Sequence, residues 1–307
     1  MNLKGIYPIV PTPFLDNGEV DYDSIERLVD CMTKKSVHGL AIMGALGEGP
    51  KMTDSERCEI IKFFRNRMPG DMHLVVGTRA PATDPAKIQA QKARDLGADA
   101  LLLGPHGIQK DKPLLEYYQQ VSAAAQIPCV IHDYPAVTGI TMSVELITNM
   151  FNTAEHIQYI KLEDPPTGMK MQALQKTVGE PLKVFGALGG NFALEELQLG
   201  AVGIMTGFVY AELLVQLFDH TQAGDWDAAR QLFYDFLPLT RWEFQPPVGI
   251  SLRKHLLKRM GIFTSTKVRH PGVDADPKTV EQMIQIINFL NSKGYQLQGS
   301  LDGGIRS

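Results

Sequence analysis

A lysine ends an apolar segment near the middle of the chain, in His156-Ile-Gln-Tyr-Ile-Lys161-Leu162. An ammonium group is costly to bury, and burial lowers the pKa of a lysine, so that a neutral, nucleophilic amine becomes available near neutral pH. Such an amine can attack the carbonyl of a 2-oxo acid, and the resulting iminium weakens a neighbouring C–C or C–O bond. Lys161 could instead extend from its strand into solvent, and the segment alone leaves both interpretations open.

Two side chains that could move a proton occur in a second apolar segment, Cys129-Val-Ile-His132-Asp133-Tyr134. In a strand, His132 and Tyr134 share one face and Asp133 takes the other, where we expect it to order the neighbouring loop. A neutral imidazole can carry protons near pH 7, while the Tyr134 phenol would reach further toward the strand end. His132 could equally be a hydrogen-bonded core histidine, so these roles stay open.

Both segments belong to a repeated pattern. Residues 36–45, 96–105 and 199–207 each combine a small-residue turn, an apolar run and a glycine, after a segment with helical periodicity. Apolar runs without alternation are typical of parallel strands buried on both faces, and repeated alternation with helices predicts an α/β protein with a closed (β/α)8 barrel. An open doubly wound sheet is the competing fold, but no GxGxxG motif follows the first strand. We predict strands near 5–10, 39–43, 73–77, 100–104, 128–133, 157–162, 183–187 and 203–206.

The pattern becomes purely helical after residue 223. We therefore divide the chain into residues 1–223, a barrel that carries the active site at its C-terminal strand ends, and residues 224–307, a helical region packed on it. Asp276-Pro277 should start the last helix. Its apolar face is formed by Val280, Met283, Ile284 and Ile287.

Composition excludes several classes of protein. The 307 residues are 44% hydrophobic with a formal net charge of -4, which gives no electrostatic case for binding nucleic acid. No apolar run is long enough to span a bilayer, and the first residues lack the apolar core of a signal peptide. Cys31, Cys58 and Cys129 are too widely spaced for a disulfide framework or a zinc site, so we expect a cytoplasmic protein.

Several short motifs occur in a fixed order, and the order carries more information than any one of them. They are Gly5-Ile-Tyr-Pro-Ile-Val-Pro-Thr-Pro-Phe14, Gly44-Ala-Leu-Gly-Glu48, His132-Asp-Tyr-Pro135, Ile160-Lys161 and Arg269-His-Pro-Gly272. Together they resemble the dihydrodipicolinate synthase / N-acetylneuraminate lyase family of class I, Schiff-base-forming aldolases. The resemblance implies a TIM barrel with a C-terminal helical extension, and it implies that Lys161 is the Schiff-base lysine. It also implies a homotetramer or homodimer and no metal or organic cofactor.

The chain departs from the family where protons move and where a second carboxylate binds. The loop from Gly44 to Gly47 lacks the family's hydroxyls, although its backbone N–H groups can hold a carboxylate. His132 stands at the position of the catalytic tyrosine, and Val137 stands where the synthases carry an arginine. The resemblance implies substrate contacts at Gly44, Ala45, Leu46, Gly47, Gly186 and Ile204, with the missing side chain of Gly186 letting the substrate approach.

Four polar residues near these motifs receive weaker assignments. We expect Glu48 to anchor its own loop. Glu163 and Asp164 follow Lys161 directly, and solvated loop carboxylates are the favoured interpretation, although one of them could steady the ammonium or bind substrate hydroxyls. His106 could reach a neighbouring site, as the matching family tyrosine does.

The sequence therefore predicts a lyase that joins Lys161 to pyruvate or a 2-keto-3-deoxy acid and then cleaves or forms a C–C bond, or eliminates water. The alternative within the family is dihydrodipicolinate synthase itself, which condenses pyruvate with aspartate semialdehyde, here with an altered proton relay. A non-catalytic protein that binds 2-oxo acids is the third hypothesis, but such a protein does not need a costly buried amine. The partner is in each case a small molecule, with no nucleic acid or membrane.

Overall fold

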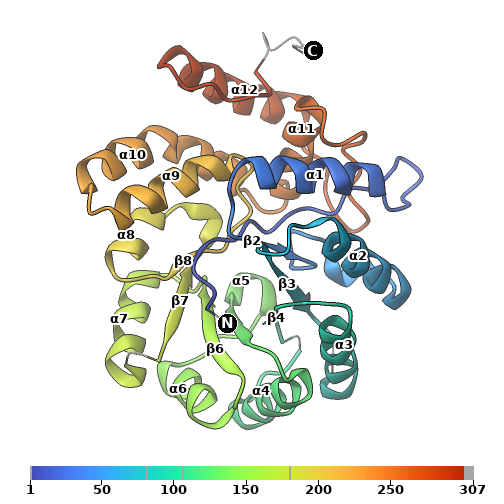
Figure 1. Ribbon diagram of the computed structural model, residues 1–307, viewed down its shortest axis with the longest axis vertical. Coiled ribbons are helices and arrows are strands. Elements are labelled where there is room, and N and C mark those ends of the chain that lie inside the picture. Colours follow the sequence, from blue (N-terminus) through green and yellow to red (C-terminus); the bar gives the residue numbers. More distant parts are fainter. Residues whose placement is uncertain (1, 81, 106, 180, 301–307) are drawn as a thin grey trace.

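The computed structural model describes residues 2–80, 82–105, 107–179 and 181–300. Within these residues eight parallel strands form one sheet in the order β1-β8-β7-β6-β5-β4-β3-β2, surrounded by helices (Figure 1). The strands are β1 (Gly5–Ile6), β2 (Gly39–Ile42), β3 (His73–Thr78), β4 (Ala100–Leu103), β5 (Cys129–Asp133), β6 (Ile157–Leu162), β7 (Lys183–Gly186) and β8 (Gly203–Ile204).

The sheet closes through the chain around its first strand. β1 pairs with β8 on one side, and on the other side Ile9 forms a parallel bridge with Ala41 of β2. The predicted (β/α)8 barrel is therefore confirmed. β1 is shorter than the predicted 5–10 because Pro8 and Pro11 have no N–H to donate to a ladder.

Helices follow the strands in the expected alternation. α2, for example, begins after Thr53, whose hydroxyl accepts from the Glu56 N–H while the Glu56 carboxylate accepts from the Thr53 N–H, a reciprocal capping box. The barrel helices are α1 (Tyr22–Lys34), α2 (Asp54–Arg67), α3 (Thr83–Asp95), α4 (Asp111–Ala125), α5 (Pro135–Thr138), α6 (Val144–Thr153), α7 (Thr167–Val178), α8 (Ala193–Gln198) and α9 (Ala211–Gln222), with 3-10 turns η1 (Gly49–Lys51) and η2 (Leu188–Gly190).

Side chains at alternate strand positions fill the inside of the barrel. Tyr159 of β6 packs there with Tyr7 and Phe185, whereas Ile160 belongs to the outer layer between the strands and the helices. Because strand side chains alternate, Lys161 faces inward again, at the C-terminal end of β6. The aromatic side chains pack in the barrel interior on the N-terminal side of Lys161.

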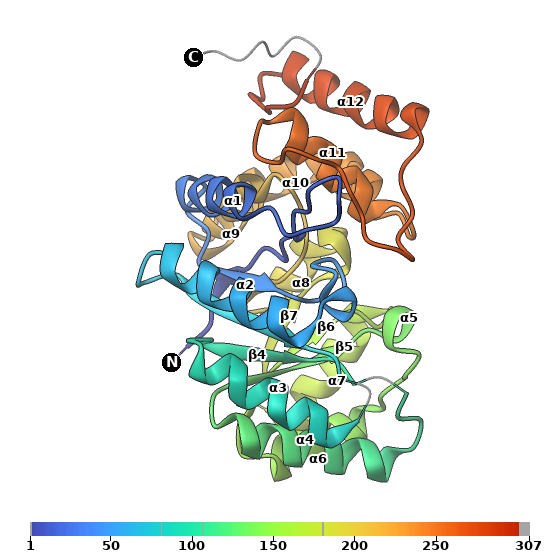
Figure 2. The ribbon, with the colours of Figure 1, turned by 90° about the vertical axis from the view of Figure 1, so that its right-hand side faces the viewer.

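The C-terminal helices lie at one end of the molecule, with α12 (Pro277–Ser292) outermost (Figures 1 and 2). α10 (Trp226–Glu243) packs against α9, α11 (Gly249–Arg259) and α12. Asp276 caps α12 as predicted, and Met283, Ile284 and Ile287 are buried on its inner face. None of the helices in the described part of the chain is long and apolar enough to cross a membrane. The division of the chain at residue 223 stays a prediction.

Candidate active site

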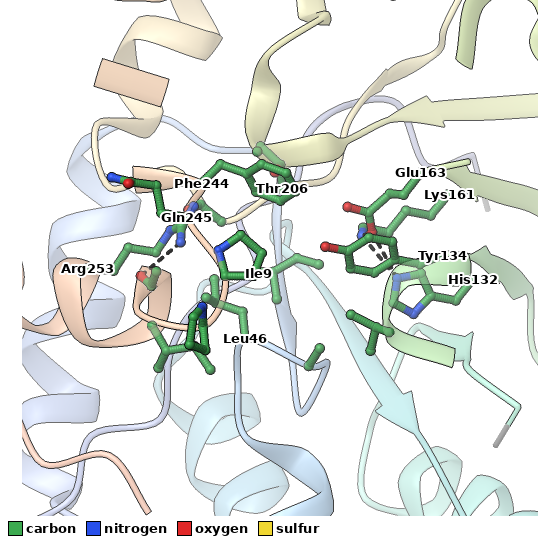
Figure 3. A pocket seen from close by; sticks show the side chains of 18 residues that line it. Ile9, Leu46, His132, Tyr134, Lys161, Glu163, Thr206, Phe244, Gln245 and Arg253 are labelled. Carbon is green, nitrogen blue, oxygen red and sulfur yellow. Dashed lines mark hydrogen bonds and ion pairs between the residues drawn. The ribbon is translucent and has the colours of Figure 1, made fainter. Parts of the chain in front are cut away.

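Lys161 is buried at the C-terminal end of its strand. It lies beside His132 of β5 in the sheet register, and both side chains face the same cavity (Figure 3). Lys161 Nζ is 3.2 Å from His132 Nε2, and only 3% of the lysine is exposed. The lysine therefore does not extend into solvent, and the structure brings it together with a second predicted site residue.

Glu163 completes this cluster, and the interpretation of this residue as a solvated loop carboxylate is wrong. Its Oε1 contacts Lys161 Nζ and lies 2.9 Å from His132 Nε2, while its Oε2 accepts the Leu188 N–H at 3.1 Å. The Glu163 N–H donates to the Asp133 carbonyl at 2.8 Å, which continues the strand pattern beyond β6. Glu163 thus shares the inward face of Lys161, two positions away, and is 4% exposed.

Burial sets the protonation of this cluster. It lowers the pKa of Lys161 well below its usual value, and the positive charge of Arg79 acts in the same direction while the buried carboxyl of Glu196 opposes it. Burial also lowers the pKa of His132, helped by the charges of Lys161 and Arg79. His132 is therefore a neutral imidazole near pH 7.

Tyr134 and Asp133 point to opposite sides of the chain at the end of β5. Tyr134 lines the cavity, and the centre of its ring lies 5.7 Å from Lys161 Nζ. Burial raises the pKa of the phenol. Asp133 faces away and lies 2.6 Å from Lys170 Nζ of α7, with a pKa raised by burial to about 6. Asp133 therefore ties the outer face of β5 to α7, while Tyr134 faces the cavity.

The loop after β2 is fixed by Glu48 beneath it. Glu48 is fully buried and in a left-handed conformation, and it accepts from Lys254 Nζ at 2.6 Å, Lys51 Nζ at 2.9 Å and the Arg269 N–H at 3.0 Å. Ala45 and Leu46 line the cavity, and neither backbone N–H donates to another described residue. Glu48 thus anchors the loop, as expected, and leaves two donors free for a carboxylate.

The C-terminal region forms the other wall of this cavity, which has a volume of about 240 Å³. Sequence reasoning placed the site on residues 1–223 and missed this wall. A side chain on Gly189, in η2, would lie 2.6 Å from Phe244, so the glycine lets the C-terminal loop approach. Phe244, Gln245 and Arg253 of this wall are labelled in Figure 3. Its other residues are Pro246, Pro247, Gly249 and Ile250.

Four of the predicted substrate contacts do not line the cavity. Gly44 and Gly47 lie in the carboxylate loop on either side of Ala45 and Leu46, and Ile204 is buried in β8. A Cβ on Gly186 would lie 2.1 Å from Oε2 of Glu196. The space left by this glycine is therefore filled by a buried carboxyl group of α8, and packing explains the residue. His106 lies outside the described residues.

The described residues hold no group of three His, Cys, Asp or Glu side chains that could bind a metal ion. Cys31, Cys58 and Cys129 are unpaired thiols. The described chain thus offers a cluster of amine, imidazole, carboxylate and phenol as its chemical groups. Such a cluster suits covalent catalysis through an amine with proton transfer nearby.

Comparison with known proteins bears on this arrangement. The sequence model of the dihydrodipicolinate synthetase family matches residues 2–289. The chain belongs to this family. A relative from Azospirillum brasilense, an L-2-keto-3-deoxyarabonate dehydratase, is 30% identical over 296 residues, which cover 94% of each chain. A 4-hydroxy-tetrahydrodipicolinate synthase from Methanococcus maripaludis is 27% identical over 83% of this chain and 89% of its own length.

A solved structure agrees with the family assignment. The crystal structure of dihydrodipicolinate synthase from Rhodopseudomonas palustris superposes with a TM-score of 0.88 at 31% sequence identity, covering 93% of this chain and 97% of that one. The match to the Azospirillum dehydratase and the match to the Rhodopseudomonas structure each extend over nearly the whole chain, including the C-terminal helices. The family match therefore extends through the barrel and into the C-terminal helices.

Proposed function

We propose that the protein is a class I lyase that forms an imine between Lys161 and a 2-oxo acid, and then cleaves or forms a C–C bond or eliminates water. One observation carries the proposal: Lys161 Nζ is buried at a cavity, 3.2 Å from the His132 imidazole and in contact with the Glu163 carboxylate. A purely structural lysine would not need two proton acceptors at an open cavity. The names of the relatives, a dehydratase and a synthase, both fit imine chemistry.

In the proposed reaction the substrate carboxylate accepts hydrogen bonds from the backbone N–H groups of Ala45 and Leu46. The neutral amine of Lys161 attacks C2. The departing oxygen receives one proton from the amine nitrogen and a second from solvent, both through His132 and Glu163, and leaves as water to give the iminium.

In C–C cleavage the C4 hydroxyl loses its proton, the C3–C4 bond breaks to release an aldehyde, and the enamine left on Lys161 takes up a proton at C3. In elimination C3 loses a proton to give the enamine, and the C4 hydroxyl takes up a proton and leaves as water. Water then hydrolyses the imine and restores the amine. Tyr134, further toward the opening, serves the substrate hydroxyl group in this scheme.

Dihydrodipicolinate synthase activity is the second candidate, because two of the similar proteins carry that activity in their names. We propose that the protein lacks this activity, because of one residue that lines the cavity. Val137 of α5 stands where the synthases carry an arginine that would pair with a second carboxylate. We expect negligible condensation of pyruvate with aspartate semialdehyde. A coupled assay with a kcat/KM on the order of 10⁴ M⁻¹s⁻¹ or above would reverse the choice between the two.

Borohydride trapping tests the proposed chemistry. Incubation with pyruvate and borohydride should reduce the imine to a stable adduct, and peptide mapping should place that adduct on Lys161 alone. Lys254, which is also buried and touches a glutamate, is the internal control. An unmodified protein, or an adduct on another lysine, would overturn the proposal. The homotetramer or homodimer implied by the family stays a prediction, which sedimentation velocity can check.

A further inference from the structure

Arg253 reaches the cavity from α11, on the side opposite the catalytic cluster. Figure 3 shows Arg253 and Gln245 on one side of the cavity and Lys161 with His132 on the other. Only 4% of Arg253 is exposed, and a buried guanidinium needs partners for its N–H groups, because a buried donor without an acceptor is unfavourable. The partners of these N–H groups therefore indicate the role of the residue.

Backbone carbonyls engage two of the three guanidinium nitrogens. Nη1 donates to the Glu243 carbonyl at 2.7 Å and to the Gly249 carbonyl at 2.9 Å, and Nε donates to the Gly207 carbonyl. Because a guanidinium is rigid and planar, these bonds fix the direction of Nη2 without engaging it. Nη2 donates to none of the described residues, and it is not among their side-chain nitrogens that are buried without a partner. Its N–H groups are therefore accessible from the cavity.

Gln245 supplies a complementary group. Its Nε2 donates to the Trp242 carbonyl at 2.7 Å, which identifies the other end of the amide as the oxygen. That oxygen, Oε1, accepts from none of the described residues, and Gln245 lines the cavity on the same side as Arg253. A hydroxyl group can accept from Nη2 and donate to Oε1, whereas a carboxylate can only accept and a methyl group can do neither.

The charge of Arg253 favours the same kind of ligand. The Glu243 carboxylate lies 3.2 Å from Nε, is fully buried, and also accepts the Val209 N–H at 3.2 Å. The guanidinium is thus already balanced within the protein, and a substrate carboxylate at Nη2 would add a second negative charge beside Glu243. A neutral hydroxyl adds no charge, and its hydrogen bond to a charged donor is stronger than one between neutral groups.

We propose that Arg253 Nη2 and Gln245 Oε1 form a second subsite, which binds the terminal hydroxyl group of a hydroxylated 2-oxo acid. The inference rests on the proposed function, because the imine at Lys161 fixes which end of the substrate points toward α11. Arg253 acts in this scheme by binding and selecting the substrate, and it takes no part in proton transfer. The C-terminal loop therefore closes the cavity and also recognises the far end of the substrate.

Two pairs of substrates test the subsite in the parent protein. 4,5-Dihydroxy-2-oxopentanoate is compared with 4-hydroxy-2-oxopentanoate, and 4,5,6-trihydroxy-2-oxohexanoate with 4,5-dihydroxy-2-oxohexanoate, so that each pair differs only in the terminal hydroxyl. All epimers are used, and NMR follows substrate consumption, which detects both cleavage and dehydration. In at least one pair kcat/KM should favour the terminal hydroxyl by about 10-fold to 100-fold, the range for a hydrogen bond to a charged group.

Two results would overturn the inference in the parent protein. The first is the absence of a preference in either pair. The second is a higher kcat/KM for 4-hydroxy-2-oxopentanedioate, which ends in a carboxylate, than for the acids with a terminal hydroxyl.

Arg253→Lys tests the residue itself. Lysine keeps the charge beside Glu243 but has no second nitrogen to present to the cavity, so the preference for the terminal hydroxyl should fall to within a few-fold of unity. A purely structural role would lower kcat/KM for both members of a pair equally and keep the parent ratio, which would overturn the assignment of Nη2. Arg259→Lys is the matched control on the same helix. Arg259 Nε donates to the Gly299 carbonyl at 2.9 Å, outside the cavity, and this variant should keep the parent ratio.

Gln245→Met provides a second variant in case Arg253→Lys does not fold. Methionine is similar in size but has no amide oxygen, so the ratio should again fall, and an unchanged ratio would remove Gln245 from the subsite. Pyruvate trapping on the parent protein separates the two proposals. Without an adduct on Lys161 the proposed function fails, whereas an adduct without a preference for the terminal hydroxyl rejects the subsite alone.

Discussion

Two lysines in the described chain are buried, and each touches a glutamate. Lys161 is 3% exposed and contacts Glu163, while Lys254 is 0% exposed and pairs with Glu48 at 2.6 Å. Burial is the first cause of a lowered pKa at both, to about 8 for Lys254 and well below the usual 10.5 for Lys161. Lys254 also donates to the Lys267 carbonyl at 2.6 Å and lies over the Phe14 ring, away from the cavity.

The difference between these lysines is access, together with the neighbours that can take a proton. Lys254 is enclosed by protein partners and ties α11 to the carboxylate loop through Glu48. Lys161 has an imidazole at 3.2 Å and one open side at the cavity. A lowered lysine pKa is therefore shared by a structural and a candidate catalytic residue, and geometry must separate the two. The predictions below change one lysine environment at a time.

The largest effect should follow from Lys161→Arg. Arginine stays protonated and cannot attack a carbonyl, so turnover of any 2-oxo acid substrate should fall by about 10³-fold or more, and the borohydride adduct should disappear. Circular dichroism should show the parent secondary structure. Residual turnover within tenfold of the parent would mean that Lys161 is not the nucleophile. Lys161 would then lack the catalytic role that distinguishes it here from Lys254.

Glu163→Gln should give the next largest loss. Glutamine keeps the size and one acceptor but cannot take up a proton, and losing a proton carrier typically costs about 10² to 10⁴ in rate. The loss should appear in kcat with little change in KM. Asp164→Asn, at the neighbouring, partly buried ion pair with Lys170, is the matched control and should stay within a few-fold of the parent because Asp133 still pairs with Lys170. Equal effects of both variants would assign Glu163 a structural role only.

On the other lysine, Lys254→Met should act on stability and not on chemistry. Removing one partner of a buried ion pair costs about 3 to 5 kcal/mol, and we expect the lower end because Lys51 and the Arg269 N–H still hold Glu48. Urea unfolding measures the loss, and Lys254→Met/Glu48→Gln should recover part of it. The pyruvate adduct on Lys161 should persist in the folded variant. If Lys254→Met loses the adduct while its stability is unchanged, the structural role assigned to Lys254 is wrong.

Most of the fold and part of the site could be predicted from the sequence. The apolar runs and the Gly-containing turns located all eight strands, because burial on both faces leaves a local signal. Glu163 was misassigned because a carboxylate followed by Asp164-Pro165-Pro166 is typical of a polar turn. The signal was nevertheless available: a strand that continues one residue past Leu162 must put Glu163 on the face of Lys161.

The wall from Phe244 to Arg253 left no such signal. Two prolines between α10 and α11 mark a loop. Its position, however, depends on contacts between residues far apart in the sequence, such as Gly189 with Phe244 and Gly207 with Arg253. Local periodicity reports which face of an element is buried and says nothing about which distant element covers it. The wall that the C-terminal loop contributes to the cavity could therefore not be predicted from the sequence, whereas the wall that carries the amine could.

The smallest expected effect, at about 1.4 kcal/mol or less per pH unit, is the pH dependence of stability that Lys254 contributes. Its pKa is about 8 in the folded chain against 10.5 in the unfolded one, so between these values the unfolded chain binds more protons. The free energy of unfolding must then rise with pH across that window, by at most about 1.4 kcal/mol per pH unit, and level off above it. Subtracting the urea-unfolding curve of Lys254→Met from that of the parent isolates this rise from other titrating groups. A difference curve that falls or stays flat between pH 8 and 10.5 would mean that Glu48 outweighs burial, and the contrast between the two lysines would then lie in their pKa values as well as in their access to the cavity.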